Sequence, residues 1–382
     1  MSAFQLLIRT TNSGTSSSTQ FTLPGDSGET YDFVIDWGDG GADETINSGS
    51  SWTHTYSSGG DYTLSITESS TGGFPAIKFN NGGDKLKVLE LANWGTNKWI
   101  TFEDAFYGCS NLTITATDHA TAVTGFVTDF SFAWRDNSLT SFPLIDTSSG
   151  TNFRYSWVNN SLTSFPLIDT SSGTNFSFAW LNNSLTSFPL IDTSSGTNFS
   201  GAWRENSLTS FPLIDTSSGT TFSFAWDGNS LTSFPLIDTS SGTDFGNAWR
   251  GNSLTSFPLI DTSRGTNFSG AWRDNSLTSF PLIDTSSGTN FGIAWAGNTI
   301  NTGDYNALLA GLSANANNSV TWGGGSSKYH DTGQTQRDIL TAAPRNWTIT
   351  DGGYDATYVP PSSGAPAQNA QHNNLRNIRM AP

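Results

Sequence analysis

Hydrophobic positions recur through the middle of the chain with a constant period of 23 residues. The segment NSLTSFPLIDTS occurs seven times, first at Asn137 and last at Asn275. A tryptophan recurs at the same spacing from Trp134 to Trp295. Twenty-three residues are too few for a separate domain, so the period predicts one coil per repeat, stacked on its neighbours in a solenoid.

Each coil supplies an apolar set that we expect in the interior of the stack. In the first coil this set is Trp134, Leu139, Phe142, Leu144 and Phe153. Equivalent residues of stacked coils should lie side by side and form ladders. The run that follows, from Asp146 to Gly150, predicts a turn, because aspartate accepts hydrogen bonds from the backbone two residues on and glycine tolerates positive φ.

A proline interrupts the predicted strand of every coil. Side chains of a strand alternate, so Pro143 and Ile145 should face outward if Phe142 and Leu144 face inward. Repetition then predicts an exposed apolar stripe that contacts another protein. The alternative is an irregular strand with Ile145 buried, because proline donates no backbone hydrogen bond to a sheet. The predicted stripe comprises Pro143, Ile145, Pro166, Ile168, Pro189, Ile191, Pro212 and Ile214.

Variation between coils is concentrated around the tryptophan. Equivalent positions of stacked coils lie side by side, so the variable residues should line one edge of the solenoid. This edge is either a recognition surface for a host-surface protein or glycan, or a turn that tolerates many residue types. The predicted recognition edge comprises Arg135, Tyr155, Val158, Leu181, Arg204, Glu205, Asp227, Arg250 and Arg273.

The coil resembles a leucine-rich repeat. The spacing Leu139-x-x-Phe142-x-Leu144-x-x-Thr147 follows that of the family. The next half, DTSSGTNFSFAW, resembles BspA-type leucine-rich repeats of bacterial and phage surface proteins, with Phe153 and Trp157 where that family has methionine and phenylalanine. The resemblance implies a leucine-rich-repeat-like solenoid and a place on a cell or phage surface.

The N-terminal region has the pattern of short strands and turns. The motif W-G-D-G at Trp37–Gly40, H-x-Y at His54–Tyr56 and the strand from Gly60 resemble a PKD-type immunoglobulin-like β-sandwich. That resemblance implies a spacer or contact module. The predicted fold is therefore mainly β: a PKD-like sandwich at 1–73, an N-terminal cap with irregular first coils at 74–125, the repeat solenoid at 126–298, a C-terminal cap at 299–353 and an extended tail at 354–382.

The C-terminal cap has helical and strand signals. Helical spacing at Asp304–Leu312, after Asn301, predicts a short capping helix, and Gln336–Ala342 is a second candidate. Trp322 and Trp347 begin predicted closing strands. The tail is rich in proline, alanine, asparagine and glutamine, so it is either flexible or ordered by a neighbouring subunit.

Charge and cysteine content narrow the class of protein. The formal net charge of −16 argues against nucleic acid and anionic membrane as partners, since both require a basic surface. The single cysteine, Cys109, excludes a disulfide scaffold. We find neither a Sec signal peptide nor an apolar stretch long enough to span a membrane. The composition is typical of a surface protein, yet no export signal is visible. A virion component that is released by lysis of the host would explain both observations, and so would a processed chain.

Catalytic and metal-binding patterns are weak. The four histidines, His54, His119, His330 and His372, lack metal-ligand spacing, and the chain has no phosphate-binding loop, dinucleotide-binding glycine pattern or G-x-S-x-G motif. One aspartate per coil fits turn capping better than a calcium cage. The sequence therefore predicts a non-enzymatic protein without cofactor or metal, forming a phage tail fibre or similar surface appendage for attachment. Its predicted partners are other copies of itself, other virion proteins and a host-surface protein or glycan. The alternative is a subunit of an extracellular filament, assembled through the solenoid face and the C-terminal tail.

Overall fold

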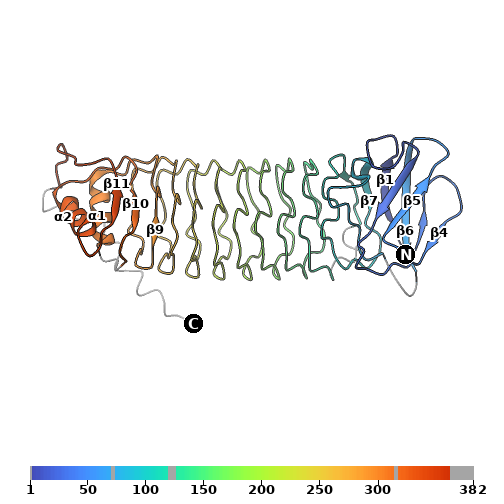
Figure 1. Ribbon diagram of the computed structural model, residues 1–382, viewed down its shortest axis with the longest axis horizontal. Helices are drawn as coiled ribbons and strands as arrows, with labels where there is room; N and C mark the ends of the chain where they lie inside the picture. The colour runs from blue at the N-terminus through green and yellow to red at the C-terminus, as the bar shows by residue number, and fades with distance from the viewer. Residues whose placement is uncertain (1, 70–73, 119–125, 314–316, 362–382) are drawn as a thin grey trace.

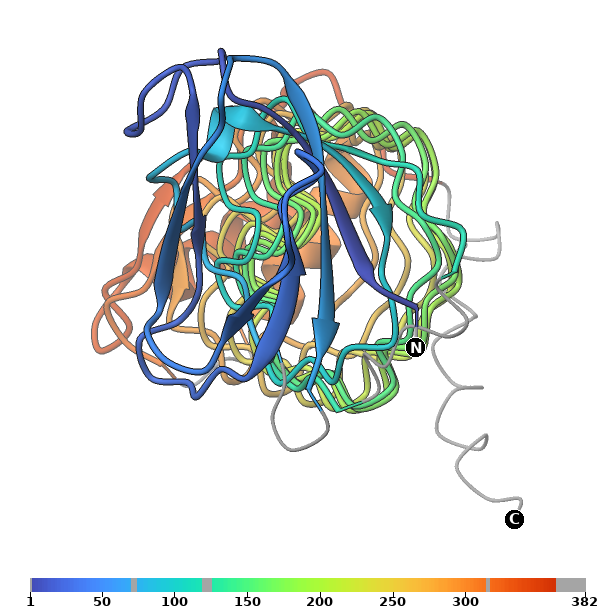
Figure 2. The same ribbon diagram turned by 90° about the vertical axis from the view of Figure 1, so that its right-hand side faces the viewer.

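The protein is elongated, with a row of stacked coils between two end structures (Figure 1). A computed structural model describes residues 2–69, 74–118, 126–313 and 317–361. The fold is mainly β, and the described residues contain two α-helices, both near the C-terminal end. Viewed along the long axis, the coils lie over one another with little lateral shift (Figure 2).

The N-terminal end consists of two β-sheets around an aromatic core. The smaller sheet pairs β2 (Gln20–Pro24) with β5 (Ser51–Thr55). The larger sheet has six strands in the order β4 (Glu44–Ile46), β3 (Phe33–Asp36), β6 (Asp61–Glu68), β1 (Phe4–Arg9), β7 (Val88–Asn93) and β8 (Thr113–Ile114). Alternate residues of β1 are buried, as a strand with one face on the core requires.

The residues of the W-G-D-G and H-x-Y motifs meet in space. The ring of Trp37 stacks on His54 with centroids 4.9 Å apart, and His54 Nε2 lies 2.9 Å from Asp39 Oδ2. The Tyr56 hydroxyl donates to the backbone oxygen of Trp37 at 3.1 Å. The hydrogen bond from His54 lowers the pKa of Asp39. Gly38 has φ +80°, and a Cβ there would lie 2.4 Å from a backbone oxygen, so this turn requires glycine.

The larger sheet leads directly into the coils. Strand β7 pairs antiparallel with β1 on one side and parallel with β8 on the other. In the parallel pair Glu90 faces Thr113, an offset of 113 − 90 = 23 residues, which is already the period of the repeat. The coils therefore cover the edge that the N-terminal sheet would otherwise expose.

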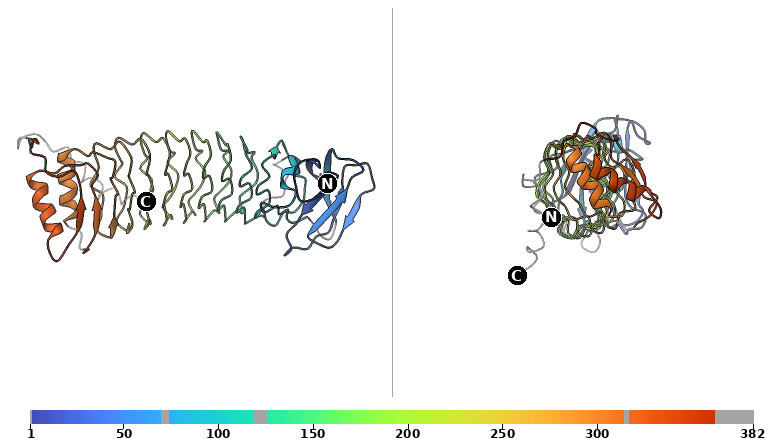
Figure 3. Two further views of the ribbon diagram at one scale, coloured as in Figure 1. Left: turned by 45° about the horizontal axis from the view of Figure 1, so that its top comes forward. Right: turned by 90° about the vertical axis from the view of Figure 1, so that its left-hand side faces the viewer.

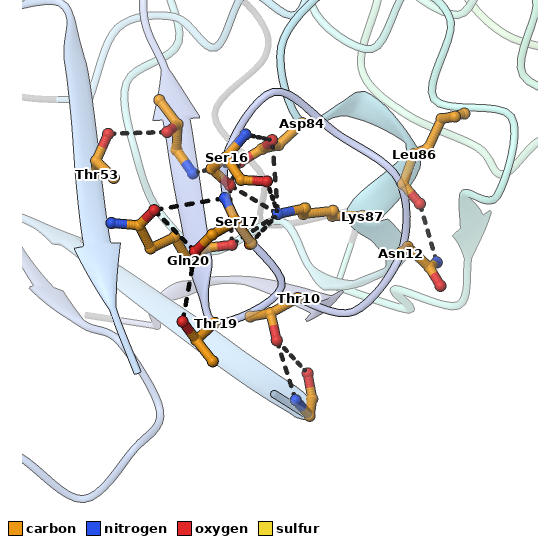
Figure 4. Close-up of polar contacts among 12 residues, drawn as sticks. Thr10, Asn12, Ser16, Ser17, Thr19, Gln20, Thr53, Asp84, Leu86 and Lys87 are labelled. Atoms are coloured by element: carbon orange, nitrogen blue, oxygen red, sulfur yellow. Dashed lines mark hydrogen bonds and ion pairs between the residues drawn. The ribbon is translucent and has the colours of Figure 1, made fainter. Parts of the chain in front are cut away.

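A buried ion pair joins the N-terminal sheets to the segment that leads into β7 (Figure 4). Lys87, at the end of the 3₁₀ turn Lys85–Lys87, has its Nζ 3.7 Å from Asp84 Oδ1, and both side chains are 0% exposed. Lys87 Nζ donates to the backbone oxygens of Ser16, Ser17 and Gln20 at 3.1, 2.8 and 2.8 Å. Asp84 accepts from the backbone nitrogens of Ser16 and Thr22 at 3.0 and 2.8 Å. Burial lowers the pKa of Lys87.

In the repeat, coils pair along one short row. Single parallel bridges join equivalent residues from Asp129↔Asn152 to Asn267↔Asn290, each 23 residues apart. The proline-containing segments form no strand in the described coils. The row of parallel bridges thus lies in the Thr-Asn-Phe segment, which contains no proline.

The tryptophan segments are built from tight turns linked to the next coil. Ala133 N donates to Phe130 O at 3.2 Å across a turn whose third residue, Phe132, has φ 59°. The next left-handed residue is Asp136, also with φ 59°. These two positions hold Gly201, Asn247, Gly270 and Gly228 in other coils, because glycine and asparagine adopt positive φ most readily. The residues at these two variable positions thus share one requirement, a backbone with positive φ.

The interior consists of ladders of rings and branched side chains. Trp134 to Trp295 are fully buried and stacked, and the Phe153 and Phe142 positions form further ladders beside them. The expectation that Leu144 is interior and Ile145 exposed is wrong: Ile145 is buried and Leu144 is exposed. In the next coil Ile168 N donates to Pro166 O at 3.0 Å, a three-residue turn that reverses the strand alternation.

The C-terminal cap continues the stack and then closes it with helices (Figure 3). A three-stranded parallel sheet has the order β11 (Thr348–Thr350), β10 (Thr321–Gly323) and β9 (Asn290–Phe291), the last being part of the final coil. Helix α1 (Thr302–Leu312) packs against α2 (Asp331–Thr341). The predicted capping helices and closing strands are confirmed, although α2 begins earlier than expected. Residues 362–382 of the predicted tail lie outside the described residues.

Candidate contact surfaces of the coil stack

One face of the stack carries a row of exposed leucines. From Pro166 onward, a three-residue turn from each proline to the following isoleucine turns the intervening leucine outward, so equivalent leucines lie side by side over successive coils. Two further members, Leu259 and Leu282, are half-buried. The leucine row comprises Leu144, Leu167, Leu190, Leu213 and Leu236, which are 48, 64, 62, 63 and 57% exposed.

The predicted contact stripe therefore has a different composition. The isoleucines Ile145, Ile168, Ile191 and Ile214 are buried in the core rather than displayed. The prolines Pro143, Pro166, Pro189 and Pro212 are half-buried beside the leucine row. Inward and outward side chains alternate strictly only in an extended strand. The turn that begins at the proline, recorded from Pro166 onward, interrupts the extended conformation, so the alternation predicted the wrong residues.

The residues of the predicted recognition edge do lie in adjacent coils, but two of them are not displayed. Val158 and Asp227 are buried. Asp227 Oδ2 lies 3.0 Å from Arg204 Nε, and its Oδ1 lies 3.1 Å from Arg250 Nε. Burial raises the pKa of Asp227, and the two guanidinium groups oppose that rise. This aspartate joins three consecutive coils and is unavailable to a ligand.

The other members of the edge are at least partly accessible. Arg135, Tyr155, Leu181, Arg204, Arg250 and Arg273 are half-buried, and Glu205 is exposed. Three of the arginines pair with the acidic residue that follows them: Arg204 Nη2 lies 2.7 Å from Glu205 Oε1, Arg273 Nε lies 3.1 Å from Asp274 Oδ2, and Arg135 Nε lies 3.5 Å from Asp136 Oδ2.

An outer stack of aromatic rings begins this edge. Tyr107, Phe132, Tyr155 and Phe178 are stacked with successive centroid distances of 6.3, 5.0 and 4.9 Å. Arg154, which the sequence-based prediction omitted, has its Cζ 4.9 Å from the Tyr155 centroid. Comparison of the coils could have revealed it, since the equivalent residue is serine or glycine in the others.

An asparagine ladder holds the coils together, and sequence reasoning assigned it no role. Asn206 Nδ2 donates to Trp180 O and Trp203 O at 2.9 and 3.2 Å, and its Oδ1 accepts from Leu185 N at 3.2 Å. The same pattern recurs in the described coils from Asn160 to Asn298. Its signal in the sequence is an asparagine at the head of every NSLT segment.

Replacement of Asn206 by alanine should lower the free energy of unfolding by about 1–3 kcal/mol, because buried backbone groups of Leu185 and Trp180 lose their partner. Urea unfolding of the full chain measures this change. The control is Ser207→Ala, at the exposed neighbouring position, which should change stability by less than about 0.5 kcal/mol. Equal stability of the two variants would contradict a structural role for the ladder.

The groups considered for catalysis or metal binding lie in turns, ring stacks or the core. Asp146 Oδ1 accepts from Ser148 N and Oγ at 3.0 and 2.7 Å, as the predicted turn requires. His330 stacks on Tyr354 in the C-terminal cap, whereas His119 and His372 lie outside the described residues. Cys109 is buried, and burial raises the pKa of its thiol. Among the described residues, no group of three or more histidine, cysteine, aspartate or glutamate side chains is placed to hold a metal ion.

No helix in the described part of the chain is long and apolar enough to cross a membrane. No protein-family model matches the chain, and no curated protein sequence is similar to it. Inference about function therefore starts from the leucine row and the outer aromatic stack.

Proposed function

We propose that this protein is a non-enzymatic structural and adhesive component of a virion-associated fibre or similar surface appendage, and that its coil stack makes the contacts. The leucine row is the observation that carries this proposal. Five consecutive coils each expose about half or more of a leucine side chain on one face. A contiguous apolar surface on a protein with a net charge of −16 is the kind that marks a contact with another protein.

Two features support the finer description of the fold. The meeting of Trp37, Asp39 and His54 at one turn supports a PKD-like sandwich, whose signature these residues resemble. The 23-residue coils, with an asparagine ladder and an apolar interior, support a leucine-rich-repeat-like solenoid. Neither module needs a cofactor or catalytic residue for a role in spacing and display.

The alternative is a filament subunit whose leucine row packs against another copy. Regular spacing of identical side chains favours it, because two identical rows can interdigitate along their length. Electron microscopy of the purified full chain separates the alternatives. Discrete particles or short oligomers support the appendage protein, and long polymers support the filament subunit.

The variant L167D/L190D/L213D should lose association through the leucine row, since each aspartate would have to be desolvated in the contact. Its folding should be retained, because all three side chains are exposed in the protomer. Sedimentation velocity and binding to the isolated particle measure association, and circular dichroism measures folding.

The matched control is S161D/S184D/S207D, which adds the same charge at exposed serines of adjacent coils. The control should associate as the unmodified protein does. Equal behaviour of the two triple variants, or a protein that is monomeric and binds no particle component at high concentration, would overturn the role of the leucine row.

A further inference from the structure

Two arginines lie against the same two rings of the outer aromatic stack. Arg135 Cζ is 5.7 Å from the Phe132 centroid and 5.5 Å from the Tyr155 centroid. Arg154 Cζ is 5.5 and 4.9 Å from the same two centroids. Arg135 also lies 4.9 Å from the ring centroid of Tyr107. Two positive charges are thus concentrated on one small patch of a strongly acidic protein; Arg135, Arg154, Tyr107, Phe132 and Tyr155 are named here the arginine–aromatic patch.

The charges of this patch are poorly compensated. Arg204, Arg250 and Arg273 each have a carboxylate oxygen within 3.1 Å. In contrast, Arg135 Nε is buried without a hydrogen bond, and the nearest carboxylate oxygen, on Asp136, is 3.5 Å away. The exposed guanidinium of Arg154 makes no hydrogen bond or ion pair with any residue that the structure describes. Its donors are free to bind an anion.

The patch also departs from the rest of the repeat. Phe132 and Tyr155 have φ 59° and 57°, and the equivalent residues Phe178, Phe224 and Ile293 of other coils have the same left-handed conformation. Arg154 stands where other coils have Ser177, Ser200 or Gly246. The additional arginine, and not the backbone conformation, therefore distinguishes this patch from the rest of the repeat.

The geometry limits the ligand. The rings cover each other's faces, so a flat base or sugar ring cannot stack on their inner members. The guanidinium groups of the two arginines are the groups left to bind a ligand. A guanidinium group binds a carboxylate through two parallel hydrogen bonds. Beside them runs a row of amides, in which Asn182 Nδ2 donates to Asn159 Oδ1 at 2.9 Å and Asn159 Nδ2 donates to Asp136 Oδ1 at 2.6 Å. Such amides suit neutral hydroxyl groups.

We infer that the arginine–aromatic patch binds the carboxylate of an acidic saccharide, with Arg154 as its main ligand. A polymer with one carboxylate and several hydroxyl groups per sugar matches a small positive patch beside a row of neutral amides. A DNA strand fits less well, because its sugar hydroxyls are esterified to phosphates and leave no free hydroxyl group for the row of amides. The inference gives a ligand class to the proposed attachment role.

Isothermal titration calorimetry of the full chain against polygalacturonate and polysialic acid tests the inference, with neutral dextran and single-stranded DNA as comparisons. We expect binding to at least one carboxylated polymer, weakened by salt, and none to dextran. R154S should reduce affinity about tenfold or more, the size expected when a charged hydrogen bond is lost. This variant restores the serine of neighbouring coils and should fold normally.

The matched control is R264S, which removes the same charge at an exposed turn and also restores the serine of other coils. It should bind like the unmodified chain. The inference is overturned if neither carboxylated polymer binds, if R154S and R264S lose affinity equally, or if DNA binds as tightly. The triple leucine variant retains Arg154, so saccharide binding in that variant distinguishes failure of this inference from failure of the leucine-row proposal.

Discussion

Replacement of Trp203 by alanine is expected to lower the free energy of unfolding of the coil stack by about 3–5 kcal/mol. The indole stacks between Trp180 and Trp226 at centroid distances of 5.7 and 5.5 Å. Phe188 and Phe211 meet it edge-on at 5.5 and 4.8 Å. Alanine would leave a cavity lined by three packed coils, and a stack in which each coil contacts only its neighbours cannot fill it from elsewhere.

Trp203→Phe is the matched control for this cavity. Trp203 Nε1 makes no hydrogen bond with a described residue, so phenylalanine removes ring volume without orphaning a partner. Its cost should be clearly smaller than that of alanine. Guanidinium unfolding followed by far-ultraviolet circular dichroism measures both changes. Equal costs for the two variants would show that stacking of the ladder contributes little to stability.

Lys87→Met is expected to destabilise the contact between the N-terminal sheets and the segment that leads into β7 by about 3–5 kcal/mol. The change leaves a buried carboxylate without its cation. Asp84 and Lys87 are both fully buried. The backbone oxygens of Ser17 and Gln20 would also lose their donor. Thermal unfolding and limited proteolysis of the N-terminal sheets measure this effect.

The double variant D84N/K87M should recover part of the lost stability, because it removes the uncompensated charge. K98M serves as the control for loss of a lysine at an exposed position. Destabilisation by K98M comparable to that of K87M would contradict the role of the buried pair. So would a double variant whose loss of stability equals the sum of the losses caused by D84N alone and K87M alone.

The sequence predicted a mainly β chain, and that is what the structure has. It predicted the turn at Asp146, because the aspartate side chain accepts a hydrogen bond from the backbone two residues on. It predicted the helix that ends at Leu312, because a helical apolar spacing follows an N-terminal cap. The variable residues lie beside the tryptophan in successive coils, since equivalent residues of a constant repeat lie in register, but Val158 and Asp227 are buried.

Arg154 and Asn206 were missed for different reasons. The asparagine is invariant between coils, but its hydrogen bonds reach Leu185 and Trp180 in the preceding coil, and the sequence alone does not show which backbone groups face it. Arg154 is a single departure from the repeat whose importance depends on the rings beneath it. Both residues act through contacts between coils.

By itself, the sequence determined the period, the apolar content of each coil and the turn chemistry, because these depend on residues close together in the chain. Only the tertiary structure decided that Ile168 faces inward and Leu167 outward, since a hydrogen-bonded turn from Pro166 to Ile168 overrides strand alternation. It also decided that Asp227 is buried between two arginines, while Arg154 remains open to a ligand. Charge balance between neighbouring coils is a property of the stack, and no single coil specifies it.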